Sequence, residues 1–248
     1  MNQHHNEEKP KFVHGVFESI ARDYDRMNSL ISFNMHKRWR QFAMKKMEVK
    51  AGDYALDICC GTADWTLSLA HASQTGKIVG LDFSQNMLAV GQEKVDQSPD
   101  CAIIELVQGD AMALPFEDDT FDHVTIGFAL RNVKDLAHVL KEMKRVVKPG
   151  GQVVSLDLSK PTWKPFRAVY YLYFRHLLPF VGKIFANRYE QYKWLPESLL
   201  TFPDYKQLGD IMKTDIGLEN VGVYPLTGGI MALHIGHKPF EEKGKMLK

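Results

Sequence analysis

Residues 54–70 predict a buried strand, a tight turn and a helix in direct succession. The strand covers residues 54–58, the turn falls at Gly61 and Thr62, and the helix begins near Trp65. This arrangement points free backbone N–H groups and the positive end of a helix dipole at whatever lies above the strand. It favours a bound phosphate or carboxylate, although an ordinary strand-to-helix connection has the same pattern.

A second acidic position narrows the choice of ligand. Asp82 ends the next predicted strand, 25 residues after Asp57, where a carboxylate can hydrogen-bond a ribose. A dinucleotide site would also require G-x-G-x-x-G, but only Gly61 is present, with Ala63 and Thr66 at the other two positions. Asp57 would in addition repel a pyrophosphate. We therefore expect Asp57, Gly61 and Asp82 to bind S-adenosylmethionine, and a nicotinamide cofactor is the alternative.

Strands and helices alternate through the middle of the chain, which predicts a parallel, doubly wound α/β sheet. A terminal pair of strands follows, as is usual in S-adenosylmethionine-dependent enzymes. We expect one domain over residues 1–248, with an N-terminal helical lid at 12–48, a helical and aromatic insertion at 160–203 and a flexible tail at 239–248. The predicted strands are 54–58, 78–82, 103–108, 121–127, 152–158, 218–224 and 230–237, and the predicted helices are 13–24, 36–47, 64–72, 85–96, 135–146 and 204–212.

The composition excludes several classes of protein. The 248 residues are 45% hydrophobic and carry a net charge of +1, which supports a sizeable core and gives no overall bias toward nucleic acid. The three cysteines form no C-x-x-C pair, so we expect reduced thiols in a cytoplasmic protein. The polar first eleven residues predict no signal peptide, and no run of about 18 apolar residues predicts a membrane span.

Two further groups of candidate residues follow predicted strands. Asp110 and Ala111 come after strand 103–108, where they could contact an adenine, and a helix cap explains them equally well. Arg131 and Asn132 follow strand 121–127, at the edge where open parallel sheets bind their ligands. A structural salt bridge is the alternative role for Arg131.

The flanks of the predicted sheet suggest contacts with a substrate or a surface. Residues 24–39 are polar and aromatic, which fits either a lid over the site or a capped helix–loop–helix. Residues 158–189 contain no Asp or Glu but many aromatic and basic residues. This run fits a surface that meets anionic lipid, or equally a helical cap on the sheet.

Two longer motifs carry a resemblance to a known family. Residues 24–32, Tyr-Asp-Arg-Met-Asn-Ser-Leu-Ile-Ser, with His36 and Trp39, and residues 145–151, Arg-Val-Val-Lys-Pro-Gly-Gly, resemble the two signatures of the quinone-biosynthesis C-methyltransferases. The resemblance extends from about residue 13 to residue 237. It implies a class I S-adenosylmethionine-dependent methyltransferase with a mostly parallel, seven-stranded, Rossmann-like sheet and a terminal antiparallel strand. It also implies cofactor contacts by Thr62, Asp82, Asp110 and Ala111.

The same resemblance implies a prenylated quinol as substrate, with demethylmenaquinol converted to menaquinol, and some members act on a ubiquinone precursor. Only the reduced ring is electron-rich enough to attack a methyl group, and loss of a hydroxyl proton would activate it further. We assign Arg131, Tyr24 and Asp25 to this step, with His36 or a water held by Arg131 as other candidate bases. No residue cluster has the spacing of a metal site.

Other functions remain as alternatives to this hypothesis. A methyltransferase acting on another lipid or small molecule would share the cofactor strands, and a cofactor-binding scaffold would share the fold. We also expect that the protein can make peripheral contact with the inner face of a membrane. Independently of this, it can form a homo-oligomer.

Overall fold

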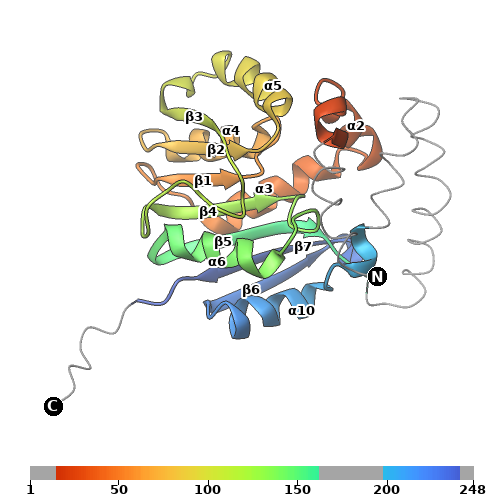
Figure 1. The fold of residues 1–248 in the computed structure, drawn as a ribbon, viewed down its shortest axis with the longest axis vertical. Coiled ribbons are helices and arrows are strands. Elements are labelled where there is room, and N and C mark those ends of the chain that lie inside the picture. Colours follow the sequence, from red (N-terminus) through yellow and green to blue (C-terminus); the bar gives the residue numbers. More distant parts are fainter. Residues whose placement is uncertain (1–14, 162–197, 241–248) are drawn as a thin grey trace.

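The computed structural model describes residues 15–161 and 198–240, which form a three-layer α/β domain (Figure 1). Its sheet has seven strands in the order β3-β2-β1-β4-β5-β7-β6. Strand β7 pairs antiparallel with both β5 and β6, whereas the pairings among β1 to β5 are all parallel. The predicted fold class is confirmed, and the antiparallel strand β7 lies between β5 and β6.

The carboxyl ends of the parallel strands meet at one edge of the sheet. The chain order reverses between β1 and β4, which is the switch point where open α/β sheets bind ligands. The strands are β1 (Ala55–Ile58), β2 (Ile78–Asp82), β3 (Ile104–Gln108), β4 (Phe121–Gly127), β5 (Val147–Leu158), β6 (Glu219–Leu226) and β7 (Met231–His237).

Two hydrophobic clusters cover the two faces of this sheet. On one face, α3 and α4 contribute Trp39, Trp65 and Leu69 against Val154 and Leu233. On the other face, α6 packs against β4 and β5, and α10 packs against the edge strand β6. The helices are α2 (Tyr24–Ile31), α3 (Met35–Met47), α4 (Asp64–Ser73), α5 (Gln85–Asp96), α6 (Leu136–Val146) and α10 (Tyr205–Asp210).

Helix caps fix several element boundaries. The Ser84 hydroxyl accepts from Met87 N and begins α5 at the predicted residue. Asp135 caps α6, and Asp204 forms a capping box with Gln207 at the start of α10. Such caps are readable from sequence because the donor and acceptor are three residues apart.

Three predicted elements were wrong in their extent. The predicted helix 13–24 is broken by a turn at residues 21–23, after which α2 begins; Tyr24 therefore stands on a new helix, although it still packs against the cluster that contains Ile20. The predicted turn at 149–151 lies within β5, where Gly150, at φ +80°, donates to Lys238 O. The helix predicted to end at residue 212 continues as a π-helix, Ile211–Asp215.

Parts of the predicted lid, insertion and tail lie outside the described residues, including nearly all of the acid-free run 158–189. Within the described chain, no helix is long and apolar enough to cross a bilayer.

The core makes a direct prediction about stability. Phe121 is fully buried, and its ring centroid lies 4.6 Å from that of Tyr54 and 5.1 Å from that of Phe116. We expect Phe121→Ala to lower the free energy of unfolding by about 3–5 kcal/mol, because it removes the buried ring and leaves a cavity. Urea unfolding measures this loss. Phe240→Ala is the control, since Phe240 is exposed, and should change stability by less than about 0.5 kcal/mol; equal losses would contradict the prediction.

Candidate active site

A cavity of about 470 Å³ opens at the carboxyl ends of β1, β2, β3 and β4. Its volume lies in the range of small-molecule sites, roughly 300–1,000 Å³. The residues around it come from the ends of these four strands and the segments that follow them, from α5 and from the N-terminal segment. They are Phe17, Tyr24, Cys59, Gly61, Asp82, Phe83, Met87, Gln108, Gly109, Asp110, Ala111, Met112, Gly127, Phe128, Ala129, Asn132, Val133 and Lys134.

Asp82 is held rigidly at the edge of this cavity. Its Oδ2 accepts from Gly61 N at 2.8 Å and its Oδ1 from Ser84 N at 2.9 Å. Burial raises the pKa of Asp82, and these backbone donors act in the opposite direction. Each carboxylate oxygen can accept a further hydrogen bond, so the cavity presents a fixed acceptor pair that suits a diol.

Asp57 lies beneath the turn and does not line the cavity. Its carboxylate accepts from Thr66 Oγ1 on α4 and from Thr125 Oγ1 on β4, both at 2.8 Å. Burial raises the pKa of Asp57 to about 6, and the two threonine hydroxyls moderate the rise. This carboxylate therefore joins β1, α4 and β4 at the point where the chain leaves the sheet.

The end of the cavity beside β3 offers acceptor groups and small residues. Asp110 accepts from Met112 N at 2.9 Å through Oδ1, and Asp110 and Ala111 both line the cavity. Gly109 is required here, because a Cβ at this position would lie 2.8 Å from Leu81 Cδ1. The second oxygen of Asp110 is placed to accept from an amino group on a flat ring.

The N-terminal segment covers the opposite side of the cavity. Phe17 and Tyr24 line it, and their rings meet edge to face with centroids 6.0 Å apart. Burial raises the pKa of the Tyr24 phenol, whereas its hydrogen bond with Asn28 and the charge of Arg131 lower it. Tyr24 is thus a neutral hydroxyl near a positive charge at neutral pH.

A cluster of five side chains fastens this segment to the turn; we call it the Asp25 cluster. Asp25 accepts from Thr62 Oγ1 at 2.6 Å and pairs with Lys94 Nζ at 2.5 Å. Lys94 also contacts Asp64 at 2.7 Å, and Arg40 contacts Asp64 at 3.0 Å. Burial alone would raise the pKa of Asp64, but the two cations lower it. The cluster joins α2, the turn, α3, α4 and α5.

A second carboxylate fastens the segment farther along. Glu18 accepts from Ser84 Oγ at 2.7 Å and from Asn86 N at 3.3 Å, at the N-terminus of α5. A carboxylate is favoured there because it faces the positive end of the helix dipole. Val16 and Ile20 pack with Met87 beside it.

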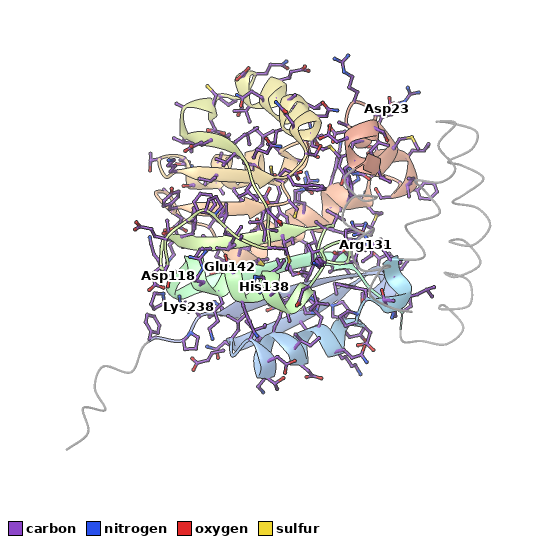
Figure 2. The ribbon with its side chains drawn as sticks, in the orientation of Figure 1. Asp23, Asp118, Arg131, His138, Glu142 and Lys238 are labelled. Atoms are coloured by element: carbon purple, nitrogen blue, oxygen red, sulfur yellow. The ribbon has the colours of Figure 1, made fainter. Side chains whose placement is uncertain are left out.

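Arg131, labelled in Figure 2, is buried and does not line the cavity. Its guanidinium forms a short ion pair with Asp157 on β5 and donates to Phe128 O, while Arg131 N donates to the other Asp157 oxygen at 3.1 Å. The two residues hold the loop after β4 against β5. Removing either partner would leave a buried, uncompensated charge.

His36 has a defined tautomer. Ser32 Oγ donates to Asn28 O at 2.6 Å, so it must accept from His36 Nδ1, 2.7 Å away. Burial and the nearby charge of Arg40 lower the pKa of His36. At neutral pH the ring is therefore uncharged, with its lone pair on Nε2.

Comparison with known proteins decides the family. Residues 2–238 match the ubiE/COQ5 methyltransferase family. The chain belongs to this family.

Relatives within the family are close. The chain is 56% identical to a demethylmenaquinone methyltransferase of Bacillus cytotoxicus over 235 residues, which are 94% of this chain and 98% of that protein. It is 55% identical to the demethylmenaquinone methyltransferase of Bacillus subtilis over 231 residues, 93% of this chain and 98% of that protein. The sequence-based resemblance is confirmed.

Solved structures support the fold of the family. A SAM-dependent methyltransferase from Aquifex aeolicus aligns with a TM-score of 0.61 at 19% identity, covering 89% of this chain and 98% of its own. Phosphoethanolamine N-methyltransferase 2 of Haemonchus contortus, in complex with S-adenosyl-L-methionine, aligns with a TM-score of 0.59 at 19% identity, covering 82% and 53%.

The structure divides the site residues predicted for this family member into two groups. Tyr24, Gly61, Asp82, Asp110 and Ala111 line the cavity. Asp25, Asp57, Thr62 and Arg131 lie around it and are held by the contacts described above. Sequence reasoning missed Phe17 and Met87 as lining residues. Phe17, seven residues before Tyr24, stands on the same helical stripe, which is the available signal. In the described ranges 15–161 and 198–240, no cluster of His, Cys, Asp and Glu could hold a metal ion.

The buried Asp57 carboxylate predicts a pH dependence of stability. Its pKa rises from 3.8 to about 6 on folding, so the folded protein retains this proton over a range in which the unfolded chain has lost it. The contribution of Asp57 to stability is therefore lost as pH rises from about 4 to about 6. A pKa shift costs about 1.4 kcal/mol of unfolding free energy per unit. Between pH 4 and pH 7, the free energy of unfolding of Asp57→Asn should therefore rise by about 3 kcal/mol relative to that of the natural chain.

Urea unfolding at a series of pH values measures this difference. Asp118→Asn is the matched control, since the Asp118 side chain is mostly exposed, on the far side of the molecule from Arg131 (Figure 2). A difference between Asp57→Asn and the natural chain that stays flat with pH would rule out the raised pKa.

Proposed function

We propose that this protein transfers a methyl group from S-adenosylmethionine to a ring carbon of demethylmenaquinol, giving menaquinol. The observation that carries the proposal is the 55–56% identity, over 93–94% of the chain, to proteins named demethylmenaquinone methyltransferase. The cavity supports it independently, because its donors and acceptors match the parts of this cofactor.

The residues present fit S-adenosylmethionine. Asp82 offers two fixed carboxylate oxygens for the ribose hydroxyls, and Asp110 offers an oxygen for the adenine amino group. Asp57 and Thr62 act on the cofactor indirectly, since they shape the turn that contains Gly61. When bound, the cofactor supplies an electrophilic methyl group.

The acceptor is the quinol rather than the quinone. A quinone ring is electron-poor, whereas the mono-anion of the quinol places negative charge on the ring carbon beside the hydroxyl. Tyr24 faces the cavity and can hydrogen-bond a quinol oxygen, and the positive charge of Arg131 lies close enough to act on the Tyr24 phenol. Arg131, although paired with Asp157 behind the cavity, is assigned to the electrostatic support of a quinolate through its effect on Tyr24, and it keeps its own proton.

The choice of proton acceptor follows from which groups are already engaged. Both carboxylate oxygens of Asp25 have partners in Thr62 and Lys94, and this favours a role in holding the segment closed. His36 lies outside the cavity lining, its pKa is lowered, and its Nε2 has no hydrogen-bond partner among the described residues, so it is available as a neutral base. We assign the proton to His36, reached through water, and give Asp25 the positioning role.

We place the reaction at a membrane surface, because the prenyl tail of the substrate is held in the bilayer. A cytoplasmic protein at the inner face of the membrane suits this substrate. The N-terminal segment, with Phe17 and Tyr24 over the cavity and Glu18 and Asp25 as its fastenings, is then the lid on the site.

The reaction itself is the first prediction of this proposal. Purified protein with S-adenosylmethionine and a chemically reduced, short-chain demethylmenaquinone analogue should add one methyl mass to the quinone, measured by mass spectrometry. The gain should depend on the reductant, because only the quinol ring attacks. Methylation without reductant would contradict the quinolate chemistry, and cofactor binding without methylation would contradict the assigned acceptor.

Tyr24 and Asp82 should separate turnover from cofactor binding. Tyr24→Phe keeps the ring over the turn and removes only the hydroxyl, so we expect turnover to fall roughly tenfold to a hundredfold. Its dissociation constant for S-adenosylmethionine should change less than about twofold. Asp82→Asn should show the reverse, with affinity weakened roughly tenfold or more by loss of a charged acceptor.

Calorimetric titration and saturating kinetics give the two quantities, and thermal melting checks that each variant is folded. A Tyr24→Phe variant that binds the cofactor as weakly as Asp82→Asn, with full turnover at saturation, would overturn the assignment of Tyr24.

A further inference from the structure

A bulky apolar side chain stands out into solvent between α2 and α3. Phe33 is 74% exposed, and Leu30, at the end of α2, is 38% exposed. Neither belongs to the hydrophobic clusters of the described core. The two residues form an apolar tip, which we call the Phe33 tip.

The backbone at this tip holds a conformation that does not suit its residues. Phe33 and Asn34 have φ values of +50° and +60°, in the left-handed region where glycine is favoured. The turn is closed by Asn34 N donating to Ser29 O at 2.9 Å and Phe33 N donating to Leu30 O at 3.3 Å. Glycine would fit this turn without strain, so neither the turn nor the core accounts for a phenylalanine here.

The surroundings of the tip are strongly basic. Residues 26–47 contain no Asp or Glu but include six Lys or Arg residues, in a chain whose net charge is only +1. Lys37 and Arg38 are exposed on the first turn of α3, directly after the tip, and Lys45 is exposed farther along the same helix. An apolar residue flanked by a basic helix face complements an anionic lipid surface.

The tip is also connected to the cavity. The first residue of α2, Tyr24, lines the cavity, and the helix of eight residues, about 12 Å long, ends beside the Phe33 tip. Figure 1 shows α2 at the side of the domain where the strands have their carboxyl ends. A bilayer that received the tip would therefore lie within about two helical turns of Tyr24.

We propose that the Phe33 tip docks the protein on an anionic lipid bilayer, with the Phe33 ring inserted among the acyl chains and Lys37 and Arg38 against the headgroups. The choice of a bilayer over other partners rests on the proposed function, since a prenylated substrate is held there. Docking through this tip brings the mouth of the cavity to the membrane surface.

Insertion is measured with the full chain carrying Phe33→Trp. The fluorescence of the added tryptophan is the emission of the variant minus that of the natural chain. It should shift to the blue with phosphatidylglycerol–phosphatidylcholine vesicles and should be quenched by lipids that are brominated on the acyl chain. The matched control is Phe240→Trp. Phe240 is 75% exposed, but it lies two residues after Lys238, on the opposite side of the domain (Figure 2), and its emission should not change.

A charge at the tip supplies the second measurement. Phe33→Asp should weaken flotation with anionic vesicles at least tenfold, and methylation of a long-chain quinol in those vesicles should fall in parallel. Methylation of the short-chain analogue should stay within about twofold of the natural chain, because Phe33 is outside the cavity. Failure of the natural chain to methylate that analogue would count against the proposed function without affecting the quenching result.

Several outcomes would overturn the docking proposal. The first is that the fluorescence of Phe33→Trp is not quenched on vesicles that do bind the protein. The second is that binding to vesicles does not depend on lipid charge or salt concentration, and the third is that the protein does not bind vesicles at all. Dimerisation in sedimentation runs that Phe33→Asp abolishes, without vesicle binding, would instead assign the tip to a second copy of the chain.

Discussion

The carboxylate of Asp57 is the point at which the sheet and the cofactor turn are joined. It accepts one hydroxyl from Thr66 on α4 and one from Thr125 on β4, so a single side chain connects three elements at the switch point of the sheet. Burying this group is costly, as its raised pKa shows. Two aliphatic contacts would hold the elements together without the desolvation of a carboxylate, but they would not fix the relative orientation of the elements. The two directional hydrogen bonds do fix it.

The turn above Asp57 has little freedom of its own. Cys59, Gly61 and Ala63 all have positive φ values, and for the two residues other than glycine this conformation is unfavourable, so contacts around the turn help to hold it. Those contacts come from Asp82 on one side and Thr66 on the other. The cavity edge is therefore rigid before any ligand arrives, which reduces the ordering cost of binding.

Aspartates near the strand ends have different roles because their partners differ. Asp57 is buried under hydroxyl donors, Asp82 is held by backbone amides at the cavity edge, and Asp157 is paired with the guanidinium of Arg131. The sequence predicts the positions of Asp57 and Asp82, since each follows an apolar run. It does not predict the roles, because the deciding partner is distant along the chain. Asp25 is the clearest case. The sequence suggests it as a base, but its ion pair with Lys94, 69 residues away, gives it the role of holding α2 in place.

The same contrast runs through the fold. The bounds of α5 follow from a local cap at Ser84, and β2 follows from an apolar run. The break at residues 21–23 has no local signal, because the helical stripe passes straight through it. In the structure Ile20 lies in a cluster with Met87, while Tyr24 packs against the same cluster from the next helix and also lines the cavity. Sequence periodicity describes one helix axis, and here the stripe is divided between two.

Because of that interruption, α2 is a separate helix that begins at the cavity and ends beside the Phe33 tip. The fastenings of α2 and the segment before it are ionic and partly exposed, with the Lys94 and Asp25 side chains 27% and 39% exposed. Such pairs contribute little stability each, and salt weakens them. The contacts over the cavity are therefore of a kind that salt weakens, whereas the Asp57 and Asp82 contacts beneath it are buried. On the proposed function, opening of α2 would admit the cofactor and the lipid-borne ring, and docking of the Phe33 tip would act on the same helix.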